Sequence, residues 1–216
     1  MAALFQFSRL VVSTARRNPF TGRISPLFYW TPRRIRRKIL GMPRITTIDY
    51  DKADSSAREI FDHFKKERGN VPNMFRTVAY RPEILRTMIA HLRAVMETGT
   101  VGVKLKELVI VRTSQINHCE YCLASHSQLA LRHGWSEEQI TDLANFRTRT
   151  DFSEREKAAL ELAERETLDS NGIDDEFWAR LRQHFDEGEI IELAAAVGLF
   201  NYFNRFNNSL RMEPTK

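Results

Sequence analysis

The chain of 216 residues contains two cysteines, and only two positions separate them. Cys119 and Cys122 are followed by His126, so on one helix the three side chains share a face. Two thiols one helical turn apart can close a disulfide, and the free amides and dipole of a helix start lower thiol pKa values. His126, four residues after Cys122, can accept its proton or hold its thiolate as an ion pair. The pattern predicts thiol redox chemistry with a nucleophile, a resolving thiol and a base.

Glu107 is the carboxylate that could join these groups. It precedes Cys119 by twelve residues, which is about 18 Å along a continuous helix. Glu107 therefore contributes only if the chain turns in between, and the polar segment 114–117 is where we expect that turn. Two antiparallel helices would then bring Glu107 towards the thiols, as the group that orients His126 or as part of a proton relay.

Zinc binding and inert packing are the alternatives for the two thiols. The cysteines and the following histidine supply three zinc ligands, although zinc modules usually take their ligand pairs from separated elements. A buried cysteine is often an inert small hydrophobe, and a thioredoxin domain is disfavoured because βαβ surroundings are missing. We predict no metal and no cofactor. A fourth zinc ligand would come from one of three residues: Glu107, His118 and His133.

The composition is that of a globular protein. Apolar residues make up 42% of the chain and glycine plus proline only 16 residues, which excludes fibrous and disordered classes. The longest apolar stretch, residues 193–200, is far shorter than the roughly 20 residues of a membrane-spanning helix. We therefore expect a soluble protein.

The net charge of +5 and the pI of about 9.4 come from the N-terminal end. Ten Arg or Lys and no acidic residue precede Asp49, whereas 23 basic and 28 acidic residues follow from there on. The body is therefore acidic and gives no charge-based case for nucleic-acid binding.

The segment 1–41 is predicted to be separate from the folded body. Its arginines, hydroxyl residues and helix-like apolar spacing are typical of a mitochondrial presequence. Five basic residues in the seven from Pro32 to Lys38 would also suit an anionic membrane surface, and a tail or a wrongly assigned start upstream of Met42 is the third interpretation. A thiol cycle needs a reducing compartment, so we expect the cytoplasm, or the mitochondrial matrix if 1–41 is a presequence.

Residues 42–216 are predicted to form one all-α domain of eight or nine helices. Pro82 suits the first turn of a helix that runs to about Thr98, and a further helix is expected from about Lys104 to Ile116. No stretch alternates with period two for long enough to be a strand. Capping boxes are expected at Ser56 with Glu59, Ser136 with Gln139, Ser153 with Glu156 and Asp186 with Glu189, the last three opening helices of about 10, 16 and 24 residues.

A short internal repeat accompanies these helices. Glu107 is followed after twelve residues by Cys119-x-x-Cys122, and Glu192 after twelve by Asn204-x-x-Asn207. Two helical halves of related design, or chance, would explain the match.

In these residues and their spacing, the sequence resembles the alkylhydroperoxidase D (AhpD) and carboxymuconolactone decarboxylase superfamily. The resemblance rests on Glu107 and on Cys119-x-x-Cys122-x-x-x-His126 after an apolar helix. The segments 71–76 and 200–205, Val-Pro-Asn-Met-Phe-Arg and Phe-Asn-Tyr-Phe-Asn-Arg, are similar to its peroxidase-related branch. The resemblance covers residues 42 to about 212.

The resemblance implies an all-helical AhpD-like domain, often trimeric or hexameric, that reduces peroxides through a thiol and disulfide cycle. Glu107 and His126 would form the proton relay, Cys122 would attack and Cys119 would resolve. A thiol or lipoyl-type reductant would restore the thiols. Tyr121 stands where the best-studied pattern has a histidine, which leaves a general disulfide reductase or a stress-response role open. Decarboxylase members lack the cysteine pair, so lactone decarboxylation is the weaker implication.

Overall fold

The computed structural model describes residues 42–215, and every α-helix or 3-10 helix named below lies in that range. This described part contains nine α-helices, three short 3-10 helices and no strand, as the all-α prediction required. The predictions about residues 1–41 lie outside it. The α-helices are α2 (Ser55–Arg68), α3 (Asn73–Val78), α4 (Pro82–Glu97), α5 (Val103–Ile116), α6 (Glu120–Arg132), α7 (Glu137–Thr141), α8 (Glu154–Asp169), α9 (Asp175–Leu181) and α10 (Glu187–Leu210).

Three of the four predicted capping boxes are present. Those of Ser136, Ser153 and Asp186 open α7, α8 and α10 with both reciprocal hydrogen bonds. The box predicted at Ser56 is wrong, because the carboxylate of Asp54 caps α2 by accepting from the backbone N–H of Ser56. The helix predicted at about ten residues after Ser136 is also shorter: α7 ends at Thr141 and a 3-10 helix, Leu143–Asn145, follows.

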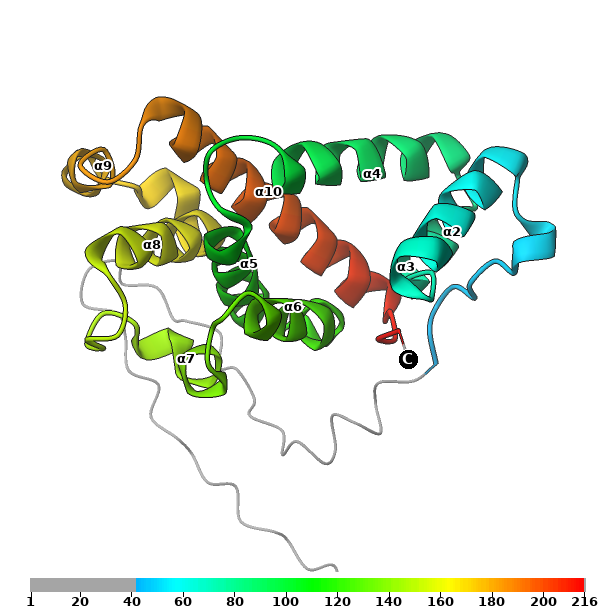
Figure 1. The fold of residues 1–216 in the computed structure, drawn as a ribbon, viewed down its shortest axis with the longest axis horizontal. Coiled ribbons are helices and arrows are strands. Elements are labelled where there is room, and N and C mark those ends of the chain that lie inside the picture. The colour runs from blue at the N-terminus through cyan, green and yellow to red at the C-terminus, as the bar shows by residue number, and fades with distance from the viewer. Residues whose placement is uncertain (1–41, 216) are drawn as a thin grey trace, which may run out of the picture. The chain divides into compact units, whose positions relative to one another are not determined.

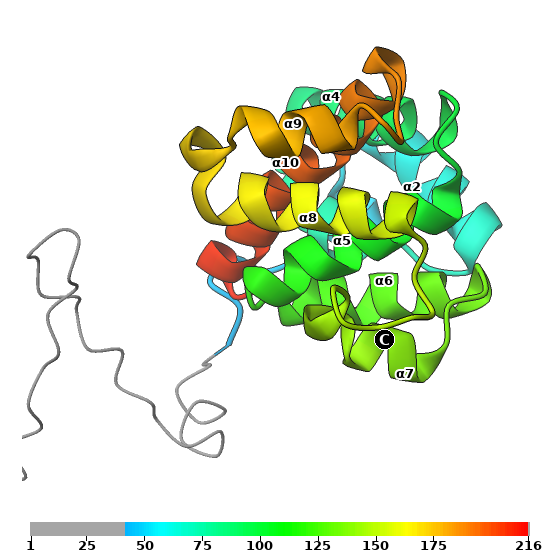
Figure 2. The ribbon, with the colours of Figure 1, turned by 90° about the vertical axis from the view of Figure 1, so that its left-hand side faces the viewer.

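Helix α10 runs through the middle of the described domain, where it packs on α4, α5, α6 and α8 (Figure 1). The turned view shows α8 lying along α5, with α6 on the other side of α5 (Figure 2). The residues that α10 buries include Leu193, Val197, Phe200 and Phe203. Because burial of apolar surface is the main favourable term in folding, α10 is the element around which the other helices are assembled. None of the described helices is both long and apolar enough to cross a membrane.

The turn that the site requires lies between α5 and α6. Helix α5 ends at Ile116, and His118 adopts a left-handed conformation with φ of 52°. The N–H of Cys119 then donates to the carbonyl of Ser114 across 3.0 Å, which closes the turn. Helix α6 begins at Glu120 with Cys119 as its N-cap residue. The two helices fold back on each other as predicted, but the turn lies at Asn117 and His118 rather than across segment 114–117, because α5 continues through Ile116.

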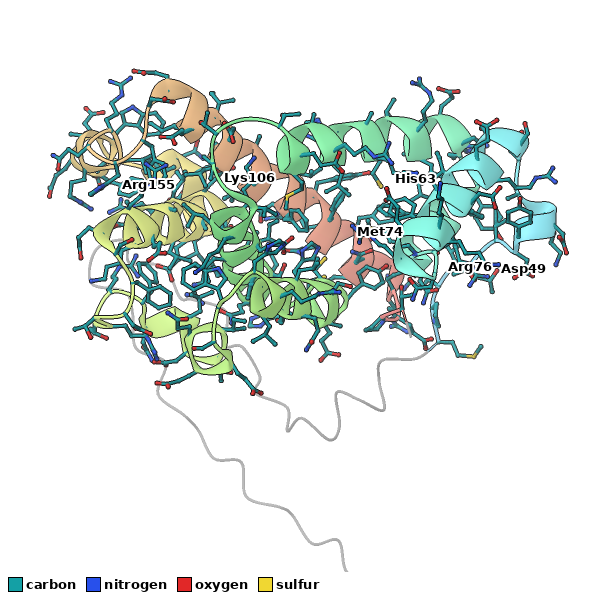
Figure 3. The ribbon with its side chains drawn as sticks, in the orientation of Figure 1. Asp49, His63, Met74, Arg76, Lys106 and Arg155 are labelled. Atoms are coloured by element: carbon teal, nitrogen blue, oxygen red, sulfur yellow. The ribbon has the colours of Figure 1, made fainter. Side chains whose placement is uncertain are left out.

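A buried ion pair fixes α5 against α10. The ammonium of Lys106 lies 2.9 Å from Oε2 of Glu192 and also donates to the carbonyls of Val95 and Thr98. The same carboxylate accepts from the backbone N–H groups of Thr100 and Val101. Lys106 is labelled at the centre of the domain in Figure 3. This network ties the α4–α5 loop to α10 and so sets the position of the neighbouring Glu107.

Candidate active site

Glu107 and His126 form a hydrogen-bonded pair across the α5–α6 turn. Nδ1 of His126 lies 2.7 Å from Oε2 of Glu107, and the carboxylate is buried. The ring of Phe200 packs edge-on against the imidazole, with 4.7 Å between ring centroids. A carboxylate that accepts from Nδ1–H leaves Nε2 as the nitrogen that exchanges protons. The expectation that the turn brings Glu107 to His126 is confirmed.

The two thiols are free and buried, and Cys122 lines a cavity. A cavity of about 260 Å³ is lined by Cys122 together with Glu107, His126, Tyr121 and Asn207, among others. Cys119 has 0% of its surface exposed, compared with 3% for Cys122. A small molecule that enters this cavity therefore meets the sulfur of Cys122 first.

The thiol pair shares its charge unequally. The thiol of Cys122 donates a hydrogen bond to the sulfur of Cys119, and this bond lowers the pKa of Cys119 to about 7. The backbone N–H of Cys122 and the side-chain amide of Asn204 lower this pKa further, whereas burial raises it. The neighbouring Cys119 and burial raise the pKa of Cys122. Free N–H groups at a helix start stabilise a thiolate, so the negative charge of the resting pair resides mainly on Cys119. Charge thus favours Cys119 as nucleophile, whereas access favours Cys122.

Two asparagines of α10 complete the surroundings of the thiols. Nδ2 of Asn207 donates to Sγ of Cys122 at 3.4 Å, and Nδ2 of Asn204 donates to Oγ of Ser114 at 3.1 Å. Oδ1 of Asn204 accepts from Nδ2 of Asn117 in the α5–α6 turn at 3.1 Å. Sequence reasoning missed both as site residues, although the repeat had singled out their spacing. The Asn-x-x-Asn segment in fact lies against the Cys-x-x-Cys segment.

Tyr121, which stands where the resemblance led us to note a missing histidine, has a structural partner. Its hydroxyl accepts from the backbone N–H of Met74 at 3.0 Å and lies 3.5 Å from Oγ1 of Thr215. Burial raises the pKa of Tyr121, so the phenol stays protonated. Tyr121 therefore joins α6 to the start of α3, where Figure 3 labels Met74, rather than supplying a proton acceptor.

The rest of the cavity wall is mainly apolar. Charged side chains are present too, those of Glu67, Arg68, Arg93 and Glu97. A wall of this kind suits an organic molecule with an apolar body. The apolar and aromatic lining residues include Phe64, Pro72, Met74, Phe75, Ile89, Leu92, Met96, Phe200 and Phe203.

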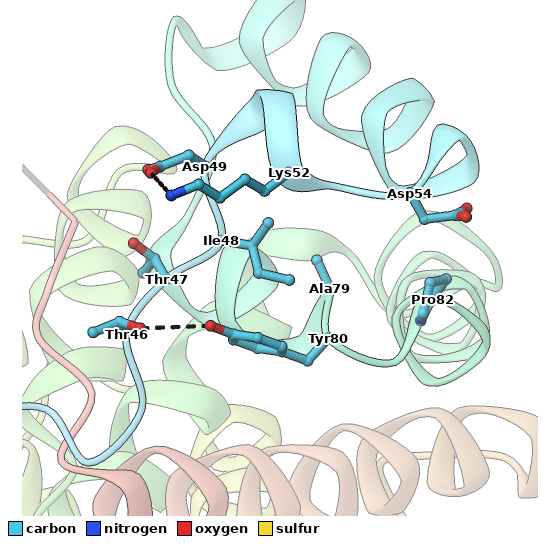
Figure 4. A pocket seen from close by; sticks show the side chains of 9 residues that line it. All are labelled: Thr46, Thr47, Ile48, Asp49, Lys52, Asp54, Ala79, Tyr80 and Pro82. Atoms are coloured by element: carbon cyan, nitrogen blue, oxygen red, sulfur yellow. Dashed lines mark hydrogen bonds and ion pairs between the residues drawn. The ribbon is translucent and has the colours of Figure 1, made fainter.

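A second cavity, of about 560 Å³, contains none of these groups. It lies between the segment that precedes α2 and the junction of α3 and α4 (Figure 4). Four of its polar side chains form two pairs, Thr46 with Tyr80 and Asp49 with Lys52. The nine residues that line it include no cysteine and no histidine.

The arrangement does not support the zinc alternative. Among the described residues, no three His, Cys, Asp or Glu side chains are placed to hold a metal ion together. Nδ1 of His126 is bound to Glu107, and His118 and His133 are exposed. Glu107, Cys122, His126 and His133 line the same cavity, but no three of these described side chains converge on a point that could hold a metal ion.

Comparison with known proteins identifies the family. The sequence profile of the carboxymuconolactone decarboxylase family matches residues 82–165, which include α4, α5 and α6. The uncharacterized protein YdfG of Bacillus subtilis (strain 168) is 32% identical over 127 residues, 58% of this chain and 86% of that protein. The chain therefore belongs to the AhpD-like carboxymuconolactone decarboxylase superfamily, as the resemblance had predicted.

Solved structures support the same fold. The AhpD core of an uncharacterized peroxidase-related protein from Ralstonia eutropha JMP134 superimposes with a TM-score of 0.74 at 25% identity, and covers 82% of this chain and 94% of that one. The debrominase Bmp8 shares the fold alone, with a TM-score of 0.69 at 20% identity over 79% of this chain and 91% of its own. The same fold thus occurs in a protein named as peroxidase-related and in one named as a debrominase.

Proposed function

We propose that this protein is a thiol-dependent peroxidase that reduces peroxides through the Cys119 and Cys122 dithiol. The observation that carries the proposal is the cavity wall in which the sulfur of Cys122 and the hydrogen-bonded His126 and Glu107 occur together. A nucleophile, a base and the group that orients the base are the parts that covalent catalysis needs. The AhpD-like fold agrees with such a function.

The reaction that we propose has two steps. The thiolate of Cys122 attacks the terminal oxygen of a hydroperoxide, an S–O bond forms, the O–O bond breaks, and the alkoxide takes a proton from His126. Cys119 then attacks the sulfenic acid of Cys122, a disulfide forms, and hydroxide leaves with the proton of Cys119 as water. One peroxide is reduced to an alcohol and water, and the two thiols are oxidised to one disulfide. A thiol or lipoyl-type reductant would complete the cycle.

Cys122 remains our choice of attacking thiol, although the lower pKa belongs to Cys119. A proton can move between two hydrogen-bonded sulfurs without solvent, and the minor form with the charge on Cys122 is the one that meets the cavity. Cys119, with its surface fully buried, has no such access. Transfer of the proton from Cys122 to Cys119 is uphill, because the lower pKa makes the Cys119 thiolate the weaker base, so the reactive form is a minor one. Access therefore outweighs the resting charge distribution.

The cavity favours an organic hydroperoxide over hydrogen peroxide as substrate. Its volume of about 260 Å³ is several times that of a water-sized molecule, which occupies about 30 Å³ in the liquid. The aromatic and methionine side chains of the wall would bind an apolar body. A lactone decarboxylase or a thiol pair that only senses oxidation is the alternative, and we propose a homo-oligomer as the working form in either case.

The experiment that tests the function is a single-turnover titration of the reduced protein with an organic hydroperoxide. We expect one equivalent of peroxide to remove both thiols and to yield the Cys119–Cys122 disulfide, identified by mass spectrometry of the peptides. A protein that leaves peroxide unconsumed, or that carries one tightly held zinc ion per chain, would contradict the proposal. Repeating the titration with Cys122→Ser provides the control for non-specific oxidation.

A further inference from the structure

Asn207 has an unusual hydrogen-bonding state. Its side chain is 1% exposed and lies in the wall of the 260 Å³ cavity beside Cys122. Nδ2 donates to the sulfur, but Oδ1 is a buried oxygen for which the described protein provides no hydrogen-bond donor. Burying an unpaired acceptor costs about 1–3 kcal/mol, so a native structure that keeps one calls for an explanation.

Two other acceptors in the same wall are already engaged. Oε2 of Glu107 is bonded to His126, and the hydroxyl of Tyr121 accepts from the N–H of Met74. Oδ1 of Asn207 is a wall oxygen, on a side chain bonded to the thiol, that is still able to accept from a hydroxyl. The donor and the acceptor of the amide share one carbon atom, so Oδ1 lies close to the nitrogen that contacts Sγ of Cys122.

We propose that Asn207 positions the reacting hydroperoxide, with Nδ2 donating to the sulfur of Cys122 and Oδ1 accepting from the O–H of the terminal peroxide oxygen. The inference rests on the proposed peroxidase function and names a substrate contact within it. During the attack the S–O bond forms to the oxygen whose O–H is held by Oδ1, and the O–O bond breaks on its far side. The same hydrogen bond then holds the O–H of the sulfenic acid until Cys119 displaces it.

This assignment separates two effects of one side chain. Loss of Nδ2 changes how much of Cys122 is thiolate, because a hydrogen bond to the charged form favours ionisation. Loss of Oδ1 changes how fast a given thiolate reacts with a hydroperoxide, because the substrate is less well oriented. An alkylating agent such as iodoacetamide needs the thiolate but offers no peroxide O–H, so it reports the first effect alone.

The test compares Asn207→Leu with the wild-type protein. Rates of reaction with cumene hydroperoxide and with iodoacetamide are measured in single turnover as a function of pH. Mass spectrometry confirms that Cys122 is the modified residue. Each rate constant is divided by the fraction of Cys122 that is thiolate at that pH. We expect the peroxide rate constant to fall about tenfold or more, as the loss of one oriented hydrogen bond implies, and the alkylation rate constant to change less than about threefold. Asn171→Leu, which changes an exposed asparagine in the 3-10 helix Ser170–Gly172, is the matched control and should change neither.

Two further variants keep the test decisive. Asn207→Asp retains an accepting oxygen and should recover most of the per-thiolate peroxide rate while its thiol titrates at higher pH. Asn207→Ala replaces the leucine variant if circular dichroism shows that the latter is unfolded. A peroxide rate per thiolate that stays at the wild-type level in Asn207→Leu would overturn the role of Oδ1, whereas a wild-type protein that does not react with the peroxide would overturn the proposed function itself.

Discussion

Nδ1 of His126 lies 2.7 Å from Oε2 of Glu107, although 19 residues separate them in the sequence. The contact exists because α5 and α6 fold back on each other at Asn117 and His118. It fixes the imidazole in the cavity wall and gives the histidine one nitrogen free for proton exchange. The predictions below test this pair, the thiols beside it and the packing that holds them.

The first prediction concerns the identity of the attacking thiol. Cys122→Ser should abolish peroxide consumption, because the sulfur in the cavity wall is lost. Cys119→Ser should still allow one oxidation and leave a trapped sulfenic acid on Cys122. Mass spectrometry with a sulfenic-acid reagent identifies the site. A sulfenic acid on Cys119 in the Cys122→Ser protein, formed at an undiminished rate, would reverse the assignment and would mean that the lower pKa of Cys119 outweighs access.

A second prediction concerns the Glu107–His126 pair. Glu107→Gln should slow peroxide turnover by about 10²-fold or more without unfolding the protein, since positioned proton transfer contributes roughly 10²- to 10⁴-fold to rates. His126→Ala should slow turnover at least as much and raise the pKa of the reactive thiol. Steady-state rates and the pH dependence of alkylation measure both effects. Glu120→Gln, an exposed carboxylate at the start of α6, is the control, and an equal loss there would argue against a specific relay.

A third prediction tests the buried face of α10. Phe203 is buried in the core beside the thiols, so Phe203→Ala should lower the free energy of unfolding by about 3–5 kcal/mol. Chemical denaturation gives the value. Its neighbour Tyr202 is 46% exposed, and Tyr202→Ala should cost about 1 kcal/mol or less. Unchanged stability of Phe203→Ala together with an altered oligomeric state would instead place Phe203 at a subunit interface.

A fourth prediction concerns the Lys106–Glu192 ion pair. Lys106→Met should destabilise the fold by about 3–5 kcal/mol, because it leaves a carboxylate in a largely buried site without its cation. The comparison is Lys52→Met, which removes the exposed partner of Asp49 and should cost less than about 1 kcal/mol. Both values come from urea denaturation. If Lys106→Met and Lys52→Met are equally stable, the buried pair does not hold the α4–α5 loop against α10.

A fifth prediction concerns the pH dependence of stability. Burial raises the pKa of Glu166 on α8 from 4.5 to about 7, so between these values the folded state holds a proton that the unfolded state has lost. Stability from this group is complete below about pH 4.5 and decreases as pH rises to about 7. We expect a loss of about 1 kcal/mol, because solvent still reaches part of the carboxylate. Glu166→Gln should remove this slope in denaturation curves from pH 5 to 8, and a slope unchanged by the substitution would contradict the prediction.

The sequence by itself determined the elements that local interactions define. Ser153 and Asp186 correctly predicted the starts of α8 and α10, because a capping box is formed by residues three apart. The helical period places Cys122 and His126, four residues apart, on one face of α6, whereas Cys119 lies just before the helix as its N-cap residue and not on that face as predicted. The N-cap of α2 was mispredicted for a local reason too. The carboxylate of Asp54, rather than a serine hydroxyl, accepts the hydrogen bond from the backbone N–H of Ser56.

Only the tertiary structure decided which groups meet around the thiols. The internal repeat singled out the spacing of Asn207 but did not predict that its amide would donate to Cys122, 85 residues away, because such a contact depends on how α10 packs against α6. The same packing buries Cys119 and leaves Cys122 in the cavity wall, so it separates two thiols that the sequence presents as equivalent partners. Side-chain burial and hydrogen bonds between distant helices arise from the summed packing of the whole domain, and no local pattern carries that information.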